Sequence, residues 1–439
     1  MLPRPYLHKE NTMADYDAIV VGAGLAGSTA AYCMAKAGLS VLVLERGDAA
    51  GAKNVTGGRM YAHSLEKIIP GFAEEAPVQR KVVRERISML TGESCFTIDF
   101  GSSRFKDPAS ASYTVLRAEF DAWLAGKAEE AGCDVVCPAV ADDLLRENGK
   151  VTGIIAGDDE LTGEVVLLAD GVNSLLAQKA GLKKELSPHH VAVGAKEVVE
   201  LSSGVINDRF NLNDGEGLAH LFAGAPSQGL VGGGFLYTNK DSLCVGLVIT
   251  VSEMAKSAAR LPDMLEAFRE SSPVKPYLTG GKIIEYSAHL VPEGGINMTP
   301  ILSADNLLVL GDAAGFCLNL GFTVRGMDYA IGSGALAAET VIEAKEKGDF
   351  SNATLGSYKT RLENSFVMQD MNTHRRAPDF IEHTPRMFKE YPELVENILA
   401  DMFTVSGPSK LMVKKALPRV FKAGLLNLAK DGFRGSRAI

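Results

Sequence analysis

Cysteine is scarce in the sequence and does not cluster. Six cysteines are scattered along the chain, and none follows Cys317. Because no secretory signal precedes them, we expect free thiols in a reducing compartment. The histidines show neither H-x3-H nor Cys/His ligand spacing, so the sequence predicts no bound metal. Cys133 and Cys137 span a predicted helix end and a strand, and we interpret this close pair as structural.

Long apolar runs and a general excess of positive charge are also missing. No run of about 18 uncharged apolar residues exists, so we expect no membrane-spanning helix. The formal net charge is −9, which disfavours a general nucleic-acid binder, because neutralising phosphates requires a concentrated basic face. Positive charge gathers in residues 410–439, where eight lysines and arginines accompany a single acidic residue, Asp431.

The sequence does contain a βαβ pattern near its start. Apolar runs at 16–21 and 41–45 predict parallel strands, and residues 26–36 predict the helix between them. Gly22, Gly24 and Gly27 form G-x-G-x-x-G before that helix, and Glu45 ends the second strand. The glycines permit a tight turn, the helix N-terminus faces a pyrophosphate, and the carboxylate accepts from ribose hydroxyls. The pattern predicts a dinucleotide site without deciding between NAD and FAD.

The rest of the chain divides by its hydrophobic pattern. Residues 191–300 alternate and are broken by glycine, which predicts a second, mainly antiparallel sheet domain with a short helix at 261–269. We assign 15–190 and 301–350 to a discontinuous nucleotide-binding domain. Residues 1–14 are expected to be a flexible extension, and 351–439 a helical C-terminal region with a basic tail.

Three motifs that follow the glycine turn favour FAD. Arg117 in "TVLRAEFDAWL", the turn "LLADGVNS" and the turn "LVLGDAAG" occur in that order. They resemble a flavoprotein family that includes aromatic hydroxylases, geranylgeranyl reductases and electron-transfer flavoprotein:quinone oxidoreductases. The resemblance implies an α/β, Rossmann-like FAD-binding fold of the glutathione-reductase type. In it, Asp312 binds the ribityl and ribose part of FAD, Arg117 approaches the pyrophosphate, and Asp170 supports the turn beside it. For both aspartates a purely local role as N-cap or turn former stays open.

Five segments narrow this resemblance. They are "GAKNVTGGRMYAHSLEKIIPGF", "FAGAPSQGLVGGGFLYTN", "EYSAHLVPEGG", "GDAAGFCLNLGFTVRGMDYA" and "TPRMFKEYPEL". Together they are similar to the FixC family of bacterial electron-transfer flavoprotein:quinone oxidoreductases, over nearly the whole chain from Tyr16 onward. The resemblance implies that residues 54–58 lie beside the isoalloxazine ring. It assigns the FAD site to Gly22, Gly24, Leu25, Ala26, Gly27, Glu45, Arg46, Asn54, Val55, Thr56, Gly57, Gly58, Arg117, Val140, Asp170, Gly171, Gly311, Asp312, Gly321, Phe322 and Thr323.

The late turn at Gly311 and Asp312 is interpreted as the far wall of the same FAD site. The apolar and glycine residues after it are expected to run beneath the ring, and a helix that starts near Gly326 points its amides at the flavin N1 and O2. A helix N-terminus there favours negative charge on the flavin. Arg325 either adds a full positive charge or faces solvent at the helix start, and the sequence leaves both open.

No protein acid, base or nucleophile is evident from the sequence. His63 and His289 lie in family-like segments, so a role near the ring stands beside a structural role. In this family the cofactor performs the redox chemistry, and the protein tunes its potential and its access.

Two features of the C-terminal region bear on partners. Fused relatives carry an iron–sulfur domain with four cysteine ligands, whereas this chain has no cysteine after Cys317, so the resemblance implies a separate ferredoxin-like protein of the FixX type. The basic tail places Leu417, Val420, Phe421, Leu425 and Leu428 at helical spacing. Such a helix lies on an anionic membrane, docks an acidic partner, or packs on its own domain.

The resemblance implies an FAD-dependent oxidoreductase that takes electrons from a FixA/FixB-type electron-transfer flavoprotein. It would reduce ubiquinone or menaquinone at the inner face of the cytoplasmic membrane, within an assembly that splits NADH electrons between quinone and ferredoxin. A geranylgeranyl reductase and a non-catalytic FAD relay subunit are the alternatives. A monooxygenase is disfavoured, because no separate pyridine-nucleotide element is seen.

Overall fold

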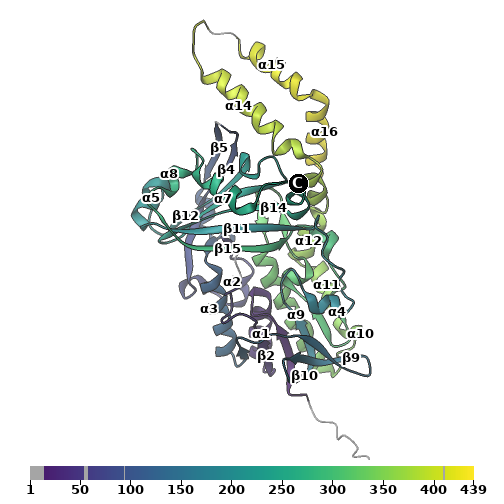
Figure 1. The fold of residues 1–439 in the computed structure, drawn as a ribbon. Coiled ribbons are helices and arrows are strands. Elements are labelled where there is room, and N and C mark those ends of the chain that lie inside the picture. The colour runs from purple at the N-terminus through teal and green to yellow at the C-terminus, as the bar shows by residue number, and fades with distance from the viewer. Residues whose placement is uncertain (1–13, 54–57, 93, 409–410) are drawn as a thin grey trace, which may run out of the picture.

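The computed structural model describes residues 14–53, 58–92, 94–408 and 411–439. Most of the expected N-terminal extension therefore lies outside the described residues. Figure 1 shows the described chain as two sheets, one above the other, with a helical arm that projects beyond the second sheet.

The first sheet contains the expected parallel βαβ unit. β1 (Tyr16–Val21) pairs with β2 (Val41–Leu44), and α1 (Leu25–Lys36) connects them. β7 (Asp134–Val136) extends the sheet beyond β2, while β10 (Asp159–Leu168), β17 (Leu307–Val309) and β16 (Ser303–Ala304) follow on the other side of β1. Its strand centres are fully buried, as apolar strands covered on both faces should be. The predicted fold class is confirmed.

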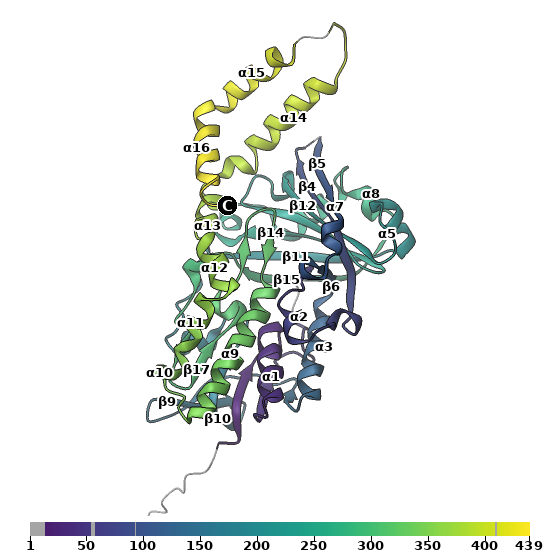
Figure 2. The same ribbon diagram turned by 180° about the vertical axis from the view of Figure 1, so that it is seen from behind.

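Two helices lie side by side against this sheet. α1 packs on α9 (Met327–Lys347), the long helix expected after Gly326, and Figure 2 shows the pair. A Cβ on Gly334 would lie 2.3 Å from the Ala26 carbonyl oxygen. Glycine at this position therefore allows the two helices to approach closely. α3 (Arg117–Glu130) packs on the other side of α1.

The second sheet has nine strands and is mainly antiparallel. Its order is β15 (Lys282–Pro292), β11 (Val191–Glu200), β14 (Ser242–Thr250), β13 (Gly232–Thr238), β12 (Glu216–Gly224), β4 (Val78–Leu90), β6 (Ser112–Val115) and β3 (Arg59–Tyr61), with β5 (Cys95–Gly101) beside β4. The second domain expected from residue 191 onward thus contains only part of this sheet, because four of its strands come from residues 59–115. β12 and β4 pair in parallel, a long-range contact that local patterning does not encode.

One face of the second sheet is covered by α5 (Ser203–Phe210), α7 (Leu261–Glu270) and α8 (Lys275–Leu278). Phe222, Leu247 and Phe268 belong to the apolar core between the sheet and these helices. α7 matches the helix predicted at 261–269. The other face carries Tyr237, which is packed against Gly58 and lies toward the first domain.

The C-terminal arm consists of α14 (Glu390–Phe403), α15 (Met412–Ala423) and α16 (Leu425–Gly435). Figures 1 and 2 show α14 leading away from the body and α15 and α16 returning to it. At its base, Asp431 is buried and accepts hydrogen bonds from Arg386 and Tyr391. Within the described residues, no helix is long and apolar enough to cross a membrane.

The smaller elements complete the chain. They are α2 (Leu65–Ile68), β8 (Asp143–Glu147), β9 (Lys150–Ala156), α4 (Leu175–Lys179), α6 (Val251–Met254), β18 (Leu318–Asn319), β19 (Val324–Arg325), α10 (Asn352–Leu355), α11 (Ser357–Glu363), α12 (Phe366–Thr373) and α13 (Ala377–Glu382).

Candidate functional site

The glycine turn before α1 has the geometry of a pyrophosphate site. Gly22 has φ +102°, and a Cβ there would lie 2.4 Å from the Ala169 carbonyl oxygen, so only glycine fits. Gly27 is equally constrained, since its Cβ would lie 2.0 Å from the Gly22 carbonyl oxygen. α1 begins at Leu25, and its N-cap residue is Gly24, which has no side chain to accept from the first helical amides. These amides, including that of Ala26, are therefore free to bind an anion.

Glu45 stands at the end of β2, beside this turn. Its Oε2 accepts from the Ala23 amide at 3.0 Å, and its Oε1 accepts from the Gly47 amide at 2.8 Å. The carbonyl of Glu45 accepts from Ala139, which brings Val140, 53% exposed, to the same edge. The turn, the acid and Val140 therefore lie together at the carboxyl ends of β1 and β2, while Arg46 follows Glu45 and is exposed.

Arg117 is fixed at the start of α3 by a buried partner. Its Nε and one terminal nitrogen donate to the two carboxylate oxygens of Asp121 at 2.6 and 2.7 Å. Burial would lower the pKa of Arg117, and Asp121 and Asp312 oppose that change. Burial raises the pKa of Asp312, and Arg117 and Lys183 pull it down. The structure thus brings Arg117 and Asp312 near one another.

Lys183 joins the two late turns and was not predicted. Its buried Nζ donates to the carbonyls of Val172, at 2.7 Å, and Ala313, at 2.9 Å. Burial lowers the pKa of Lys183, while Asp170 and Asp312 raise it. A lysine in "GLKKE" carries no motif, so only the tertiary structure reveals its role.

Asp170 and the Gly311 turn both lie near this lysine. Asp170 accepts from Ser174 Oγ at 2.8 Å, which agrees with a turn-forming role, and Gly171 follows it with φ +77°. Gly311 lies against the glycine turn, because a Cβ there would be 2.7 Å from the Cβ of Ala26. Asp312 follows in a short 3-10 helix, Gly311–Ala314.

The segment after this turn forms a hairpin that is open on its apolar side. β18 and β19 pair across Leu320–Thr323, where Gly321 has φ +82° and its Cβ position meets none of the described residues within 4 Å. Phe322 is 47% exposed, and Val324 in β19 is 43% exposed. An exposed apolar strip beside the GD turn fits a flat aromatic ring. The predicted residues Asn54 to Gly57 lie outside the described residues.

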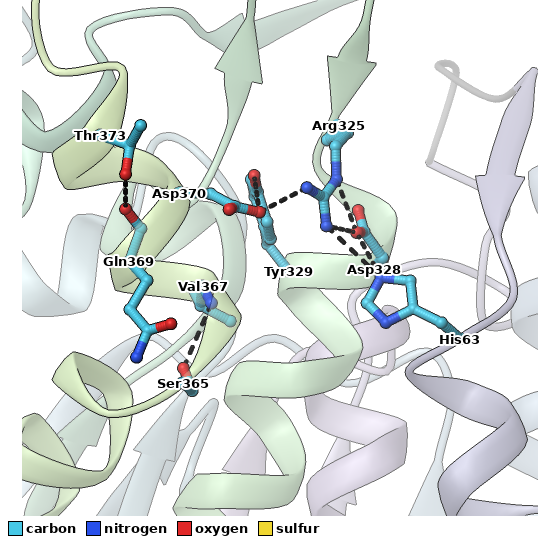
Figure 3. Close-up of polar contacts among 9 residues, drawn as sticks. All are labelled: His63, Arg325, Asp328, Tyr329, Ser365, Val367, Gln369, Asp370 and Thr373. Atoms are coloured by element: carbon cyan, nitrogen blue, oxygen red, sulfur yellow. Dashed lines mark hydrogen bonds and ion pairs between the residues drawn. The ribbon is translucent and has the colours of Figure 1, made fainter. Parts of the chain in front are cut away.

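Arg325 belongs to a charged network at the start of α9, shown in Figure 3. It donates to Asp328 in the first turn of α9 and to Asp370 in α12, and its guanidinium lies 4.5 Å above the ring of Tyr329. Burial alone would lower the pKa of Arg325, but Asp328 leads the interactions that raise it. The side chain neither faces open solvent nor contributes an unbalanced positive charge, so both interpretations of the sequence need revision.

The two histidines singled out in the sequence lie in different places. His63 Nε2 is 3.1 Å from Asp328 Oδ2 and so joins the Arg325 network. His289 lies in β15, where burial lowers its pKa and the charges of Arg46 and Arg117 lower it further. His63 is thus associated with the expected ring end, and His289 with the expected pyrophosphate end. Cys133 is buried and donates to the Ala31 carbonyl, as a structural cysteine would.

The part of the predicted site that the structure describes fits FAD. The uncapped α1 amides and the Gly22 cradle suit a pyrophosphate, Asp312 and Lys183 bracket the middle, and the open hairpin offers an apolar face. When bound, FAD would be held by these groups and would supply the redox chemistry.

Comparison with known proteins agrees with this geometry. A family model described as FAD dependent oxidoreductase matches residues 17–101 and 111–340, and the ETF-QO/FixC family C-terminal domain matches 377–439. The solved structure of a geranylgeranyl bacteriochlorophyll reductase-like protein from Thermoplasma acidophilum matches with a TM-score of 0.71 at 22% identity, covering 95% of this chain and 99% of that one. The halogenase PltM, solved with phloroglucinol and FAD, matches with a TM-score of 0.63 at 14% identity, over 96% of this chain and 85% of that one. These two likenesses concern the fold.

Sequence relatives are much closer. The chain is 55% identical over 425 residues to "Probable electron transfer flavoprotein-quinone oxidoreductase YdiS" of Escherichia coli K12, covering 97% of this chain and 99% of that protein. It is 50% identical to "Protein FixC" of Salmonella typhimurium, covering 96% and 98%. The chain therefore belongs to the FixC/electron transfer flavoprotein-quinone oxidoreductase family and is an FAD-dependent oxidoreductase.

Proposed function

We propose that this oxidoreductase passes electrons from an electron-transfer flavoprotein to a membrane quinone. The observation that carries the proposal is the 55% identity to a probable electron transfer flavoprotein-quinone oxidoreductase along 97% of the chain. The likeness to a geranylgeranyl reductase-like structure, at 22% identity, supports only a common fold.

In this proposal the chain holds the cofactor and shapes its electrostatic surroundings. The amides of α1 bind the pyrophosphate, and Arg117, locked by Asp121, remains beside Asp312. Asp328 and Asp370 are both paired with Arg325, and α9 begins without a side-chain cap, so its first amides contribute positive potential. That potential favours negative charge at the neighbouring end of a bound flavin.

We assign the C-terminal arm to the membrane surface. Phe403, Val405 and Leu411, near the bend between α14 and α15, are 78%, 79% and 67% exposed. Phe421 and Leu426 continue the apolar surface at 59% and 86% exposed. A peripheral helix inserts such side chains between lipid headgroups while nearby lysines meet anionic lipid.

The distribution of charge on the arm supports this assignment. Arg419 and Lys415 are bound within the arm, since both donate to Asp401. The cations beyond this internal pairing include Lys414, Lys422 and Lys430, which are exposed. Of the predicted stripe, Leu417, Phe421 and Leu425 are exposed rather than packed on the body. We therefore favour the inner face of the cytoplasmic membrane over packing on the chain's own domain.

We propose partners of the FixA/FixB type as electron donors and a FixX-type ferredoxin as a further acceptor, in an assembly that divides NADH electrons between quinone and ferredoxin. The FixC relatives, 50% identical over 421 residues, support this proposal.

The test combines the FAD-loaded chain, a reduced FixA/FixB-type flavoprotein and a soluble quinone under anaerobic conditions. We expect quinone-dependent oxidation of the donor only when all three are present, and loss of activity together with FAD content in Asp312→Asn. FAD-loaded chain that never reduces quinone would instead identify a relay subunit, and turnover of a prenyl lipid would identify a reductase of the geranylgeranyl type.

A further inference from the structure

A small cavity lies behind the ring-side hairpin, between the second sheet and α13. Its volume is about 30 Å³, enough for one water molecule. Its walls include Thr250 at the end of β14, Asn319 in β18, and Glu293 just after β15. His189 forms another wall, and its side chain is 54% exposed. The cavity therefore connects a surface histidine with the back of the hairpin expected to face the flavin.

Glu293 is the carboxyl group inside this cavity. Its Oε1 accepts from Asn319 Nδ2 at 3.2 Å, and its Oε2 accepts from Thr250 Oγ1 at 3.2 Å. Among the described residues, no cation lies within ion-pair distance of it. Burial raises the pKa of Glu293, and the hydrogen bonds from Asn319 and Thr250 partly offset this. The carboxyl thus retains a proton to higher pH than an exposed glutamate does.

Asn319 connects this carboxyl with the hairpin turn. While its Nδ2 donates to Glu293, its Oδ1 accepts from the Gly321 amide at 2.9 Å. Gly321 begins the predicted ring contact, Gly321 to Thr323. The side-chain amide of Asn319 therefore links the Glu293 carboxyl to the hairpin turn. The exposed apolar residues Phe322 and Val324 belong to the same hairpin.

The other titratable groups around Glu293 have different assignments. His189 is paired with Glu382 of α13, and the His190 carbonyl accepts from the Glu293 amide at 2.8 Å. Burial raises the pKa of Cys317 strongly, and Asp312, Glu293 and Asp328 raise it further, so this neighbour stays a thiol.

We propose that Glu293 is a proton-transfer group of this enzyme, exchanging protons between water in the cavity and the ring side of the hairpin. The proposal rests on the function proposed above. Reduction of a quinone to the hydroquinone consumes two electrons, supplied by the donor flavoprotein, and two protons. Glu293 supplies one of these protons: its O–H bond breaks as the group reduced on the ring side gains that proton, and a proton taken up from solvent through the cavity water then re-forms the O–H bond. The second proton also comes from solvent. Asn319 and Thr250 are positioning residues, because they act through Glu293.

The first experiment measures proton uptake without quinone. Bound FAD is reduced photochemically under anaerobic conditions in weakly buffered solution that contains a pH indicator. We expect Glu293→Gln to slow proton uptake about 100-fold, the lower range for loss of a general acid, while FAD content stays at the wild-type level. Infrared spectra should also lose a protonated-carboxyl band in this variant. Unchanged uptake kinetics together with an unchanged carboxyl band would overturn the proposal.

Glu197→Gln is the matched control. Glu197 lies in β11 of the same sheet, and burial also raises its pKa, but it faces Arg269 in α7, on the helix-covered side. Its replacement should leave proton uptake unchanged. Equal slowing in both variants would show a general effect on the sheet and would also contradict the proposal.

Thr250→Val provides a test in case Glu293→Gln loses FAD. This variant keeps the carboxyl but removes a hydrogen bond that lowers its pKa, so the pH profile of proton uptake should move to higher pH. A structural role for Thr250 would change stability and not the profile. Because neither measurement uses quinone, failure of the proposed quinone reduction leaves the assignment of Glu293 separately testable.

Discussion

The body of the molecule and its C-terminal arm differ in how far they bury apolar side chains. In the first sheet of the body, apolar strands are covered on both faces, and the charges near the FAD site are tied to partners, as Arg117 is to Asp121. In the arm, Phe403 and Leu426 are more than three quarters exposed, although α16 is anchored by buried Asp431. The body thus derives its stability from burial, whereas the exposed arm is available to another surface. Changes in the body should appear in unfolding, and changes in the arm in binding.

The largest effect should come from filling the glycine turn. Gly27→Val places side-chain atoms against the Gly22 carbonyl, so we expect loss of bound FAD and destabilisation of about 3 kcal/mol or more. Flavin absorbance and thermal unfolding measure the two effects. Gly126→Ala in α3, where a Cβ meets nothing within 4 Å, is the control and should be neutral or stabilising. Normal FAD content in Gly27→Val would contradict the pyrophosphate assignment.

Removing Arg325 should be the next most damaging change. Arg325→Ala leaves Asp328, only 1% exposed, with His63 as its remaining partner, and we expect a loss of about 3 kcal/mol in urea unfolding. The double variant Arg325→Ala/Asp328→Asn removes the charge of Asp328 and should recover part of this loss. If the double variant were as unstable as the single one, the network would not be the source of the effect.

Replacing an arm residue should weaken membrane binding and leave unfolding unchanged. Phe421→Asp removes the apolar burial of one aromatic side chain, worth about 2 kcal/mol, so vesicle binding should fall roughly 30-fold. Cosedimentation with vesicles that contain anionic lipid measures this loss of binding. Leu175→Asp, at a 63% exposed position on α4 of the body, is the matched control and should bind normally. An equal loss of vesicle binding in both variants would show that the arm is not the membrane-binding surface.

Acid should weaken the body through His220. Burial lowers the pKa of His220 to about 3, and its Nε2 is hydrogen-bonded to Ser88. Because the unfolded state binds a proton from about pH 6.5 downward, this contribution is complete above that pH and is lost as pH falls toward 3. We expect a loss of about 1.4 kcal/mol per pH unit from this residue between pH 6 and 4. In urea unfolding, the free energy of unfolding of His220→Gln should depend less steeply on pH than that of the wild type. Identical slopes in the two proteins would exclude His220 as the source of the pH dependence.

The smallest effect is expected from a single arm cation. Lys422→Gln should weaken binding to anionic vesicles about five-fold, the equivalent of about 1 kcal/mol, and should not affect binding to neutral vesicles. Lys36→Gln at the end of α1 provides a control in the body. Comparing Lys422 with Phe421 separates the electrostatic part of the arm's attachment from its apolar part.

The parts of the fold and site that could be predicted from the sequence are those whose residues lie close together along the chain. Gly22, Gly27 and Glu45 act within one βαβ unit, so spacing alone was sufficient to place them together. Strand β4 was not assigned to the second sheet, because its parallel partner β12 lies more than a hundred residues later.

Long-range contacts also define the parts of the site that were missed. Lys183 contacts Ala313, and Arg325 contacts Asp370, across separations of 130 and 45 residues. Glu293 becomes distinctive only because folding removes it from water next to Asn319. Residue type does not reveal these roles, since each depends on which distant element lies opposite.

The bridge that Lys183 makes to Ala313 also sets an order for biosynthesis. A growing chain presents the glycine turn at Gly22 early, but the carbonyl of Ala313 exists only after every strand of the second sheet has been translated. β17 must likewise join β10 before the first sheet is complete. The predicted FAD site therefore cannot be completed by an N-terminal unit alone, because it also needs Asp312 and the packing of α9 on α1, both encoded late in the chain.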